Sequence, residues 1–293
     1  MTAAATTVIP AEPHPLVTAL REIAGENPLS VIAALLLVLF VAIAVVGPWI
    51  APYDPLLTDA AAALQQPSSA HWFGTDQLGR DILSRVLVAT RTDLLIALGS
   101  VVLAATSGTV LGMCAGFFGG RWDAITVHGM DMLMAFPLFV LAMAIVAALG
   151  NTVTNIVLAS AIINLPFYVR LARAESSVLR GAGFIEAARL SGAGSPRVLF
   201  THLLPNLLPS LAVQASLNMG WAMLNAAGLS FIGLGVRPPA PEWGLMVSEG
   251  AGNVISGEWW VSLFPGLALM IAVLTFNLLG DGLRDLVDPK RRT

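Results

Sequence analysis

Six long apolar runs dominate this chain and restrict the folds that it can adopt. They cover residues 30–50, 94–118, 132–149, 152–171, 207–234 and 260–279. A helix needs about 20 mostly apolar residues to cross the hydrocarbon core of a bilayer. Only 11% of the residues are charged, whereas a soluble domain carries about 25%. The sequence therefore predicts an all-α integral membrane protein with six transmembrane helices.

The basic residues predict the orientation of these helices, because short cytoplasmic loops are enriched in Lys and Arg. The loop after the fourth run and the end of the chain carry most of them: Arg173, Arg180, Arg189, Arg197, Arg284, Lys290, Arg291 and Arg292. The loop after the first run breaks the rule with Arg80, Arg85 and Arg91, which are interleaved with aspartates. The even number of spans outweighs this exception, so we expect both termini in the cytoplasm.

Several classes of function lack the residues that they need. The chain has no Gly-x-x-x-x-Gly-Lys-Ser/Thr phosphate loop, no His-Glu-x-x-His motif and no Ser/His/Asp set at plausible intramembrane positions. Its spans are nearly free of ionisable residues, which ion-coupled carriers usually keep inside the membrane. The single cysteine, Cys114, excludes an internal disulfide, and no long basic tract suggests nucleic-acid binding. These features favour a carrier that is driven by a separate motor protein.

The loop of residues 184–205 is more elaborate than a simple linker between spans. Ala187 and Ala188 are good helix formers and are small enough for close approach by another surface. Glu186 and Arg189 lie near opposite ends of this short helix, where their charges suit the helix dipole. We expect a cytoplasmic helix that docks on a partner. A helix that merely rests on lipid headgroups is the alternative.

The rest of this loop carries signals that end one helix and begin another. Gly192 can supply the left-handed residue that ends the first helix. Ser195 followed by Pro196 is typical of an N-cap and the first position of a second helix. We expect that helix to be interrupted at Leu204-Pro205, where the chain enters the fifth span.

His128 and Asp131 are spaced three residues apart, with methionines at 130, 132 and 134. Such a group can bind a soft or borderline metal such as nickel or copper. Polar residues also occur commonly at the mouth of a span, and methionines at helical spacing usually fill gaps in a core. We favour the second interpretation and expect no metal site.

Prolines and glycines inside the spans indicate bends and close packing. Pro137 and Pro166 interrupt the third and fourth runs, and each is either a hinge or a bend that fits its neighbours. Gly108, Gly112 and Gly116 recur every four residues, a pattern that lets two helices approach closely. We expect this stripe to pack against another helix.

Residues 229–244 are rich in Gly and Pro, so we expect an irregular and rigid external segment. Its candidate functional residues are Phe231, Gly233, Gly235 and Trp243. They suggest an extracytoplasmic docking surface or an outer gate. A plain connecting loop is the alternative.

Several motifs resemble those of one transporter family. Glu186-Ala187-Ala188, Gly192 and Leu204-Pro205 resemble the EAA loop of permease subunits in ATP-binding-cassette (ABC) importers. The family usually has an aliphatic residue two positions before the leucine of the Leu-Pro pair, where this chain has His202. The segment from His202 to Asn206 is nevertheless similar to that of the peptide-transporter branch. Residues 73–85, 229–235, 238–244 and 277–289 also resemble segments of that branch. The chain is similar to the C-type permease of the dipeptide/oligopeptide/nickel group from residue 27 onward.

The resemblance implies a type I ABC importer permease fold with a cytoplasmic coupling helix. It implies four kinds of partner: a second homologous permease, two cytoplasmic ABC ATPases that bind ATP and Mg²⁺, an extracytoplasmic solute-binding protein, and a peptide substrate. The coupling residues that it implies are Glu186, Ala187, Ala188, Arg189, Gly192, Leu204 and Pro205. The chain itself is then not an enzyme and binds no cofactor.

The expected organisation has five parts: a cytoplasmic lead-in (1–29), a first span (30–50), an extracytoplasmic loop (51–92), a permease domain (93–281) and a cytoplasmic tail (282–293). We expect import of di- or oligopeptides across the cytoplasmic (inner) membrane. Nickel or another small solute is the alternative cargo. An ion-coupled secondary transporter and an intramembrane enzyme are the alternatives of a different class.

Overall fold

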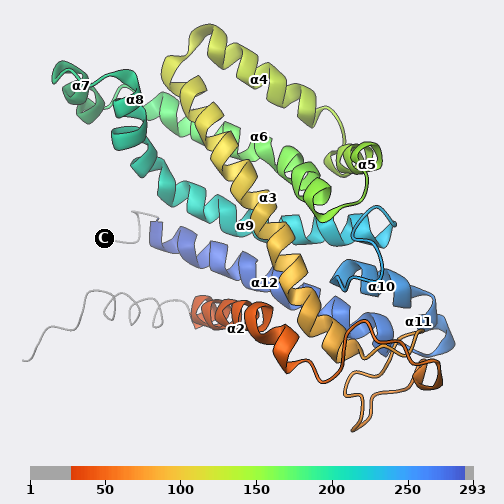
Figure 1. Cartoon of the computed structure of the whole chain (residues 1–293). Coiled ribbons are helices and arrows are strands. Elements are labelled where there is room, and N and C mark those ends of the chain that lie inside the picture. The colour runs from red at the N-terminus through yellow and green to blue at the C-terminus, as the bar shows by residue number, and fades with distance from the viewer. Residues whose placement is uncertain (1–27, 288–293) are drawn as a thin grey trace, which may run out of the picture.

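The computed structural model describes residues 28–287, in which helices and their connecting loops form a bundle without β-strands (Figure 1). Its elements are α2 (Pro28–Ile50), η1 (Ala60–Ala62), α3 (Ile82–Phe118), α4 (Gly120–Met134), α5 (Leu138–Leu149), α6 (Val153–Leu179), α7 (Gly183–Leu190), α8 (Ser195–Arg197), η2 (Val198–Leu203), α9 (Leu204–Phe231), α10 (Trp243–Ala251), α11 (Asn253–Ser256) and α12 (Trp260–Val287). Most of the expected lead-in 1–29 lies outside the described residues, as do Lys290, Arg291 and Arg292 of the expected tail.

Five of the helices are long and apolar enough to cross a membrane by themselves: α2, α3, α6, the helix that contains α9, and α12. The third expected span, residues 132–149, is not a single helix. It belongs to a pair formed by α4 and α5, which are bent by 86° at the break. Pro137 lies at this break and disfavours helical backbone at the residue before it, so Pro137 marks a sharp bend.

The directions of α3 and α6 indicate that the bent pair of α4 and α5 crosses the bundle as a sixth span. Gly99 packs on Val157 and Gly108 packs on Tyr168, so α3 and α6 run in the same direction. The chain between them must therefore return from one end of the bundle to the other, and α4 with α5 makes this return (Figure 1). Ser30 of α2 lies against Gly282 of α12, so both ends of the described chain lie at one end of the bundle.

The glycine stripe packs α3 against α6, as the sequence predicts. A Cβ atom added to Gly108 would lie 2.7 Å from the Cβ of Tyr168, and one added to Gly112 would clash with the backbone of Val169. The two helices approach so closely that a side chain would force them apart. In the same helix pair, α6 continues through Pro166 without a break.

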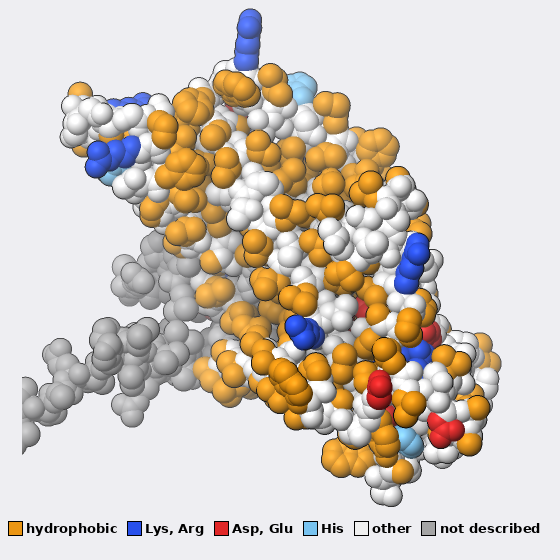
Figure 2. All heavy atoms as spheres, in the orientation of Figure 1, with side chains coloured by type: hydrophobic (Ala, Val, Ile, Leu, Met, Phe, Trp, Pro, Cys, Tyr) orange, Lys and Arg blue, Asp and Glu red, His pale blue; other side chains and the backbone are white. Residues whose placement is uncertain are grey.

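α3 and α6 both extend well beyond their apolar runs. α3 begins at Ile82, twelve residues before the expected start at residue 94, because Asp81 caps it: the Ser84 amide donates to Oδ2 of Asp81 at 2.8 Å. α6 continues to Leu179, and its charged turns remain helical because Arg170 and Arg173 pair with aspartates of α4. Figure 2 shows hydrophobic side chains spread over the middle of the bundle, with most charged ones toward its ends.

Candidate functional site

The short helix α7 lies at one end of the bundle, beyond the ends of α6 and α9 (Figure 1). Ile185 fixes it there, since its side chain is fully buried in the core cluster that also contains Phe117, Val198 and Leu203. Ala188 is half-buried against the same cluster, one turn further along the helix. One side of α7 is therefore anchored to the bundle by apolar contact.

The other side of α7 is exposed. Glu186 and Ala187 are exposed, and 89% of Leu190 is accessible. Arg189 is also exposed, but its guanidinium carbon lies 4.8 Å from the ring centre of Phe117, at the end of α3. This cation–π contact ties α7 to a second helix. Of the expected docking residues, Glu186 and Ala187 thus form an exposed surface together with Leu190, whereas Ala188 faces the bundle.

Gly192 ends α7 in the left-handed conformation that the sequence predicts, with φ of +83°. The Gly192 amide donates to the Arg189 carbonyl at 2.9 Å, and the Ala193 amide donates to the Ala188 carbonyl at 3.0 Å. This pair of hydrogen bonds is a Schellman motif, which satisfies the last carbonyls of the helix. The length and end point of α7 are therefore fixed by its own sequence.

The connection to α9 differs from expectation in two details. Gly194, not Ser195, is the N-cap of α8, because the Val198 amide donates to the Gly194 carbonyl at 3.0 Å. Leu204-Pro205 does not interrupt the helix: η2 is a π-helical turn that continues directly into α9. A wider π turn changes the hydrogen-bonding pattern just before Pro205, whose nitrogen cannot donate. The segment from α8 to α9 therefore forms one continuous helical rod.

At the opposite end, the four candidate gate residues have different surroundings. Phe231 is half exposed at the end of α9, and Gly233 ends that helix with φ of +81°. Gly235 packs so closely on Ser230 that a Cβ would clash with it. Trp243 was expected on the surface but is fully buried, and its indole nitrogen donates to the Val86 carbonyl at 3.2 Å. Trp243 is a core residue that holds α10 against α3.

Comparison with known proteins agrees with this arrangement. A family model described as "binding-protein-dependent transport system inner membrane component" matches residues 108–293, which include α7 and its exposed loop. This chain belongs to that permease family. A second model, for the N-terminal transmembrane domain of oligopeptide transport permease C, matches residues 26–67.

Relatives of the permease have names that concern peptides. The chain is 47% identical over 264 residues to a probable D,D-dipeptide transport system permease of Escherichia coli, which covers 90% of this chain and 88% of the relative. It is 45% identical over 262 residues to a di/tripeptide transport permease of Pseudomonas aeruginosa, in an alignment that covers 87% of this chain and 86% of the relative. It is 43% identical over 265 residues to a glutathione transport permease of Pectobacterium atrosepticum, in an alignment that covers 90% of this chain and 88% of the relative.

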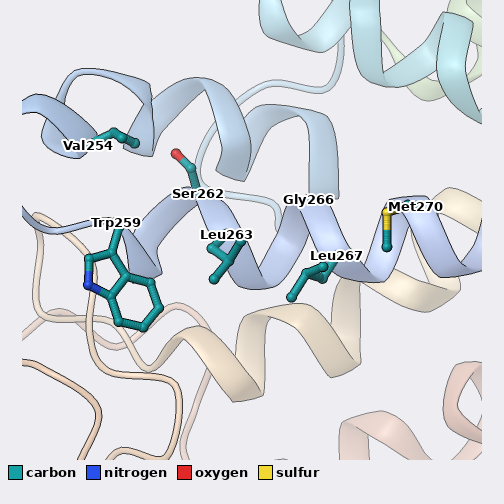
Figure 3. A pocket seen from close by; sticks show the side chains of 7 residues that line it. All are labelled: Val254, Trp259, Ser262, Leu263, Gly266, Leu267 and Met270. Carbon is teal, nitrogen blue, oxygen red and sulfur yellow. The ribbon is translucent and has the colours of Figure 1, made fainter.

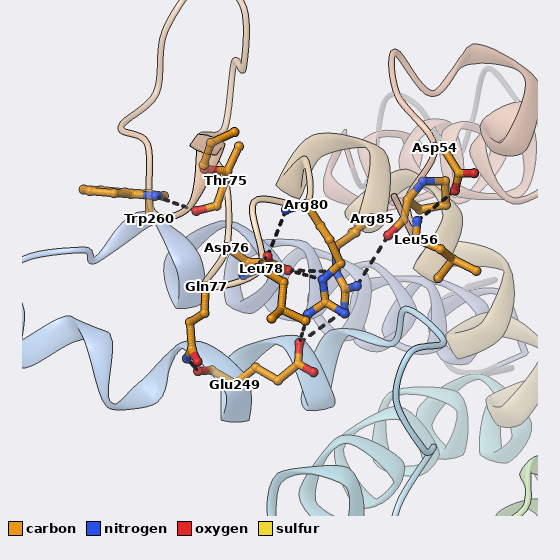
Figure 4. A network of polar contacts seen from close by, with 12 residues as sticks. Asp54, Leu56, Thr75, Asp76, Gln77, Leu78, Arg80, Arg85, Glu249 and Trp260 are labelled. Atoms are coloured by element: carbon orange, nitrogen blue, oxygen red, sulfur yellow. Dashed lines mark hydrogen bonds and ion pairs between the residues drawn. The ribbon is translucent and has the colours of Figure 1, made fainter. Parts of the chain in front are cut away.

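A network of buried charges, not foreseen from the sequence, holds the end of the permease opposite α7 (Figure 4). Nε of Arg80 donates to Oδ2 of Asp76 at 2.6 Å, and Nη2 of Arg80 donates to Oε2 of Glu249 at 3.0 Å. Nη2 of Arg85 donates to the same Glu249 oxygen at 3.2 Å. The Arg80 and Arg85 side chains are almost fully buried. These four residues, Asp76, Arg80, Arg85 and Glu249, are called the latch below. The latch joins the 51–81 loop and the start of α3 to α10.

The latch predicts a loss of stability on substitution of Glu249. Glu249→Ala leaves Arg80 and Arg85 to share Asp76 alone, which we expect to lower the free energy of unfolding by about 3 kcal/mol. Thermal unfolding of the purified permease in detergent measures this effect. Glu249→Gln should lose less because its amide oxygen still accepts hydrogen bonds, and Asp54→Ala, at an exposed carboxylate, should change little. An unchanged melting temperature of Glu249→Ala would contradict the latch.

The permease also has an apolar hollow on α12, lined by Val254, Trp259, Ser262, Leu263, Gly266, Leu267 and Met270, with a volume of about 530 Å³ (Figure 3). A second hollow of about 390 Å³ shares Gly266 and Met270 with the first and reaches Asn277. A third, of about 230 Å³, shares Leu224 and Leu269 with the second. The three hollows thus lie along α12, and the second and third also border α9.

The candidate metal residues have protein partners instead. Nδ1 of His128 lies 2.7 Å from the Ala124 carbonyl oxygen, one turn back in the same helix. Nη2 of Arg170 donates to Oδ1 of Asp131 at 2.7 Å. The part of the chain that the structure describes holds no group of three metal-ligating side chains. His128 thus contacts its own helix, and Asp131 pairs with Arg170 of α6.

Proposed function

We propose that this permease is one of two homologous membrane subunits of an ATP-driven importer of short peptides in the inner membrane. Two cytoplasmic ABC ATPases bind ATP and Mg²⁺, an extracytoplasmic protein delivers the peptide, and this chain binds no nucleotide. The observation that carries the proposal is α7: a short helix, anchored by Ile185 and capped by Gly192, that presents Glu186, Ala187 and Leu190 outward. The peptide names of its relatives support the choice of cargo.

The exposed side of α7 suits a cleft on one ATPase. Ala187 is small, so a partner surface can approach the helix backbone closely, and Leu190 adds an apolar contact. ATP binding closes the ATPase pair and moves α7. Ile185 of α7 packs with Val198 and Leu203 of η2, and η2 continues directly into α9, so this movement is transmitted to a helix that crosses the membrane. The two permeases then change from an inward-facing to an outward-facing arrangement.

The proposed orientation places the α7 end and both termini in the cytoplasm. Arg180, Arg189 and Arg197 lie in the segments around α7, which fits the enrichment of basic residues in cytoplasmic loops. Two of the three arginines that break this rule, Arg80 and Arg85, are paired with Asp76 and Glu249 in the latch. Their charge is largely neutralised, so they oppose the proposed orientation only weakly.

The hollowed face of α9 and α12 is our candidate for this chain's half of the translocation path, which the second permease would complete. Its lining is mostly apolar, with Ser262 and Asn277 as polar groups. Such a surface lets a peptide pass without holding it tightly. Specificity would then come mainly from the solute-binding protein.

Gly266 gives a test of this path. A Cβ on Gly266 would meet only Val247, at 3.8 Å, so Gly266→Ala fits without strain. Gly266→Trp would fill the two hollows that share Gly266. We expect Gly266→Trp to reduce peptide uptake at least about tenfold and to leave assembly with the second permease intact, whereas Gly266→Ala transports normally. Normal uptake by Gly266→Trp would place the path elsewhere.

The cargo is tested by uptake into membrane vesicles that contain the complete transporter. Vesicles with internal ATP should accumulate a labelled dipeptide and should accumulate no labelled nickel. Uptake of nickel without the dipeptide would overturn the peptide assignment. Uptake that follows an imposed proton or sodium gradient in the absence of ATP would instead favour the ion-coupled alternative.

A further inference from the structure

A groove of about 810 Å³ opens between α2, α3, α9 and α12, on a different side of α12 from the three hollows. Its walls are apolar and include Val41 and Val45 of α2, Leu95 and Leu98 of α3, and Phe276 of α12. About half of each of the first four side chains is accessible. This groove lies in the part of the bundle that crosses the membrane, so an apolar ligand has direct access to it.

One cation lines this apolar groove. Arg91 of α3 is exposed, and its side chain takes part in none of the ion pairs or hydrogen bonds found among residues 28–287. Figure 2 shows a basic side chain that stands among hydrophobic ones over α2 and α3. An arginine on a membrane-crossing helix is costly unless its charge reaches an anion or water. The part of the chain that the structure describes supplies no anion to Arg91.

The register of α2 on α3 gives the depth of Arg91. Gly47 packs on Leu87, where an added Cβ would lie 2.8 Å from the Leu87 carbonyl oxygen. Arg91 lies one turn further into the membrane than Leu87, by about 6 Å. Trp49 lines the same groove, near the end of α2, and 77% of its side chain is accessible. Tryptophan is enriched at headgroup level, and an arginine one turn deeper can extend its side chain to that level.

We propose that this groove binds a phospholipid, with its phosphate on Arg91 and an acyl chain along α3. A guanidinium binds phosphate through two parallel hydrogen bonds. The lipid phosphate would therefore be the anionic partner of Arg91. From Arg91 to Thr106 the groove follows α3 for about 22 Å, which is longer than one leaflet of hydrocarbon, about 15 Å. The groove is therefore long enough to hold the full depth of one acyl chain.

The bound lipid would fasten the first span to the rest of the bundle. Only Ser30, Ala33, Phe40 and Gly47 of α2 are buried, so the described chain leaves much of the surface of this helix uncovered. A lipid between α2 and α3 covers the exposed sides of both helices. We therefore expect phospholipid to raise the melting temperature of the permease.

The test uses the full-length permease in detergent and measures lipid binding by native mass spectrometry. Phosphatidylglycerol should bind, and a diacylglycerol with the same chains should bind at least about fivefold more weakly because it lacks the phosphate. Arg91→Gln should weaken phosphatidylglycerol binding about fivefold to tenfold, whereas Arg91→Lys keeps part of it. Arg237→Gln, an exposed arginine at the same end, is the matched control and should bind normally. Equal binding by Arg91→Gln, or equal binding of diacylglycerol, would overturn the proposal.

A second measurement identifies the occupant in the complete transporter. Cys114 is the only cysteine, so Leu98→Cys in a Cys114→Ser background places one thiol in the groove. Phosphatidylglycerol with a thiol-reactive acyl chain should label this cysteine in native membranes. If Leu98→Cys instead crosslinks to another polypeptide and takes no lipid label, the groove is a contact with the partner permease and the lipid proposal is wrong.

Discussion

Reversing the charge of Glu186 is expected to abolish ATP-driven uptake while the transporter still assembles. Glu186 lies in the first turn of α7 and is exposed. A lysine there opposes the helix dipole by only about 0.3–1 kcal/mol, too little to unfold α7. A wrong charge in a docked interface costs several kcal/mol. We therefore expect peptide uptake and substrate-stimulated ATPase activity to fall at least about a hundredfold.

A matched charge reversal separates docking from a general effect of charge. Asp281 is exposed near the end of α12, at the same end of the bundle as α7 (Figure 1). Asp281→Lys changes the net charge by the same amount and should leave uptake near normal. Both variants should be recovered with the second permease in equal yield. If Glu186→Lys retains stimulated ATPase activity, α7 is not the coupling element.

Gly192→Pro is expected to have an effect of similar size for a different reason. Gly192 has φ of +83°, and its amide donates to the Arg189 carbonyl. Proline fixes φ near −65° and removes this donor, so the end of α7 must rearrange. Gly192→Ala keeps the donor but costs about 1–2 kcal/mol in this conformation, whereas Gly192→Asn is tolerated better. Uptake should therefore fall in the order Gly, Asn, Ala, Pro.

Gly194 provides the control for this series. Its φ is −67°, and an added Cβ would meet only Cδ of Pro196 at 3.9 Å. Gly194→Ala should therefore transport as well as the native permease, although it lies in the same loop. Equal uptake by Gly192→Pro and Gly194→Ala would show that the left-handed cap is not needed for coupling.

Features with local causes could be predicted from the sequence. Apolar runs identified the five spans that are single helices, Gly192 ended α7, and the Gly108 stripe packed closely on another helix. Each of these depends on a few neighbouring residues and on a backbone preference that the residue type carries. The same holds for the exposed Glu186 and Ala187, which lie on the side of α7 opposite the buried Ile185.

Features that depend on distant partners could not be predicted. Glu249 completes the latch with Arg85, 164 residues away in sequence, and only the fold brings them together. Trp243 follows a Gly- and Pro-rich stretch that suggested an exposed loop, yet it is buried against α3. The π-helical turn η2 replaced an expected break at Pro205, because the helix can adjust its hydrogen bonds over several residues.

Crosslinking from α7 distinguishes a helix that docks on an ATPase from one that rests on lipid headgroups. Ala187→Cys in a Cys114→Ser background places one thiol on the exposed side of α7, and Gly120→Cys, at the start of α4 and at the same end, serves as the control. In the complete transporter, a short bifunctional reagent should join Ala187→Cys to an ATPase subunit, and ATP should change the yield. We expect this adduct for Ala187→Cys and little of it for Gly120→Cys. An Ala187→Cys that forms no ATPase adduct in a transporter active in uptake would contradict the docking of α7 on an ATPase.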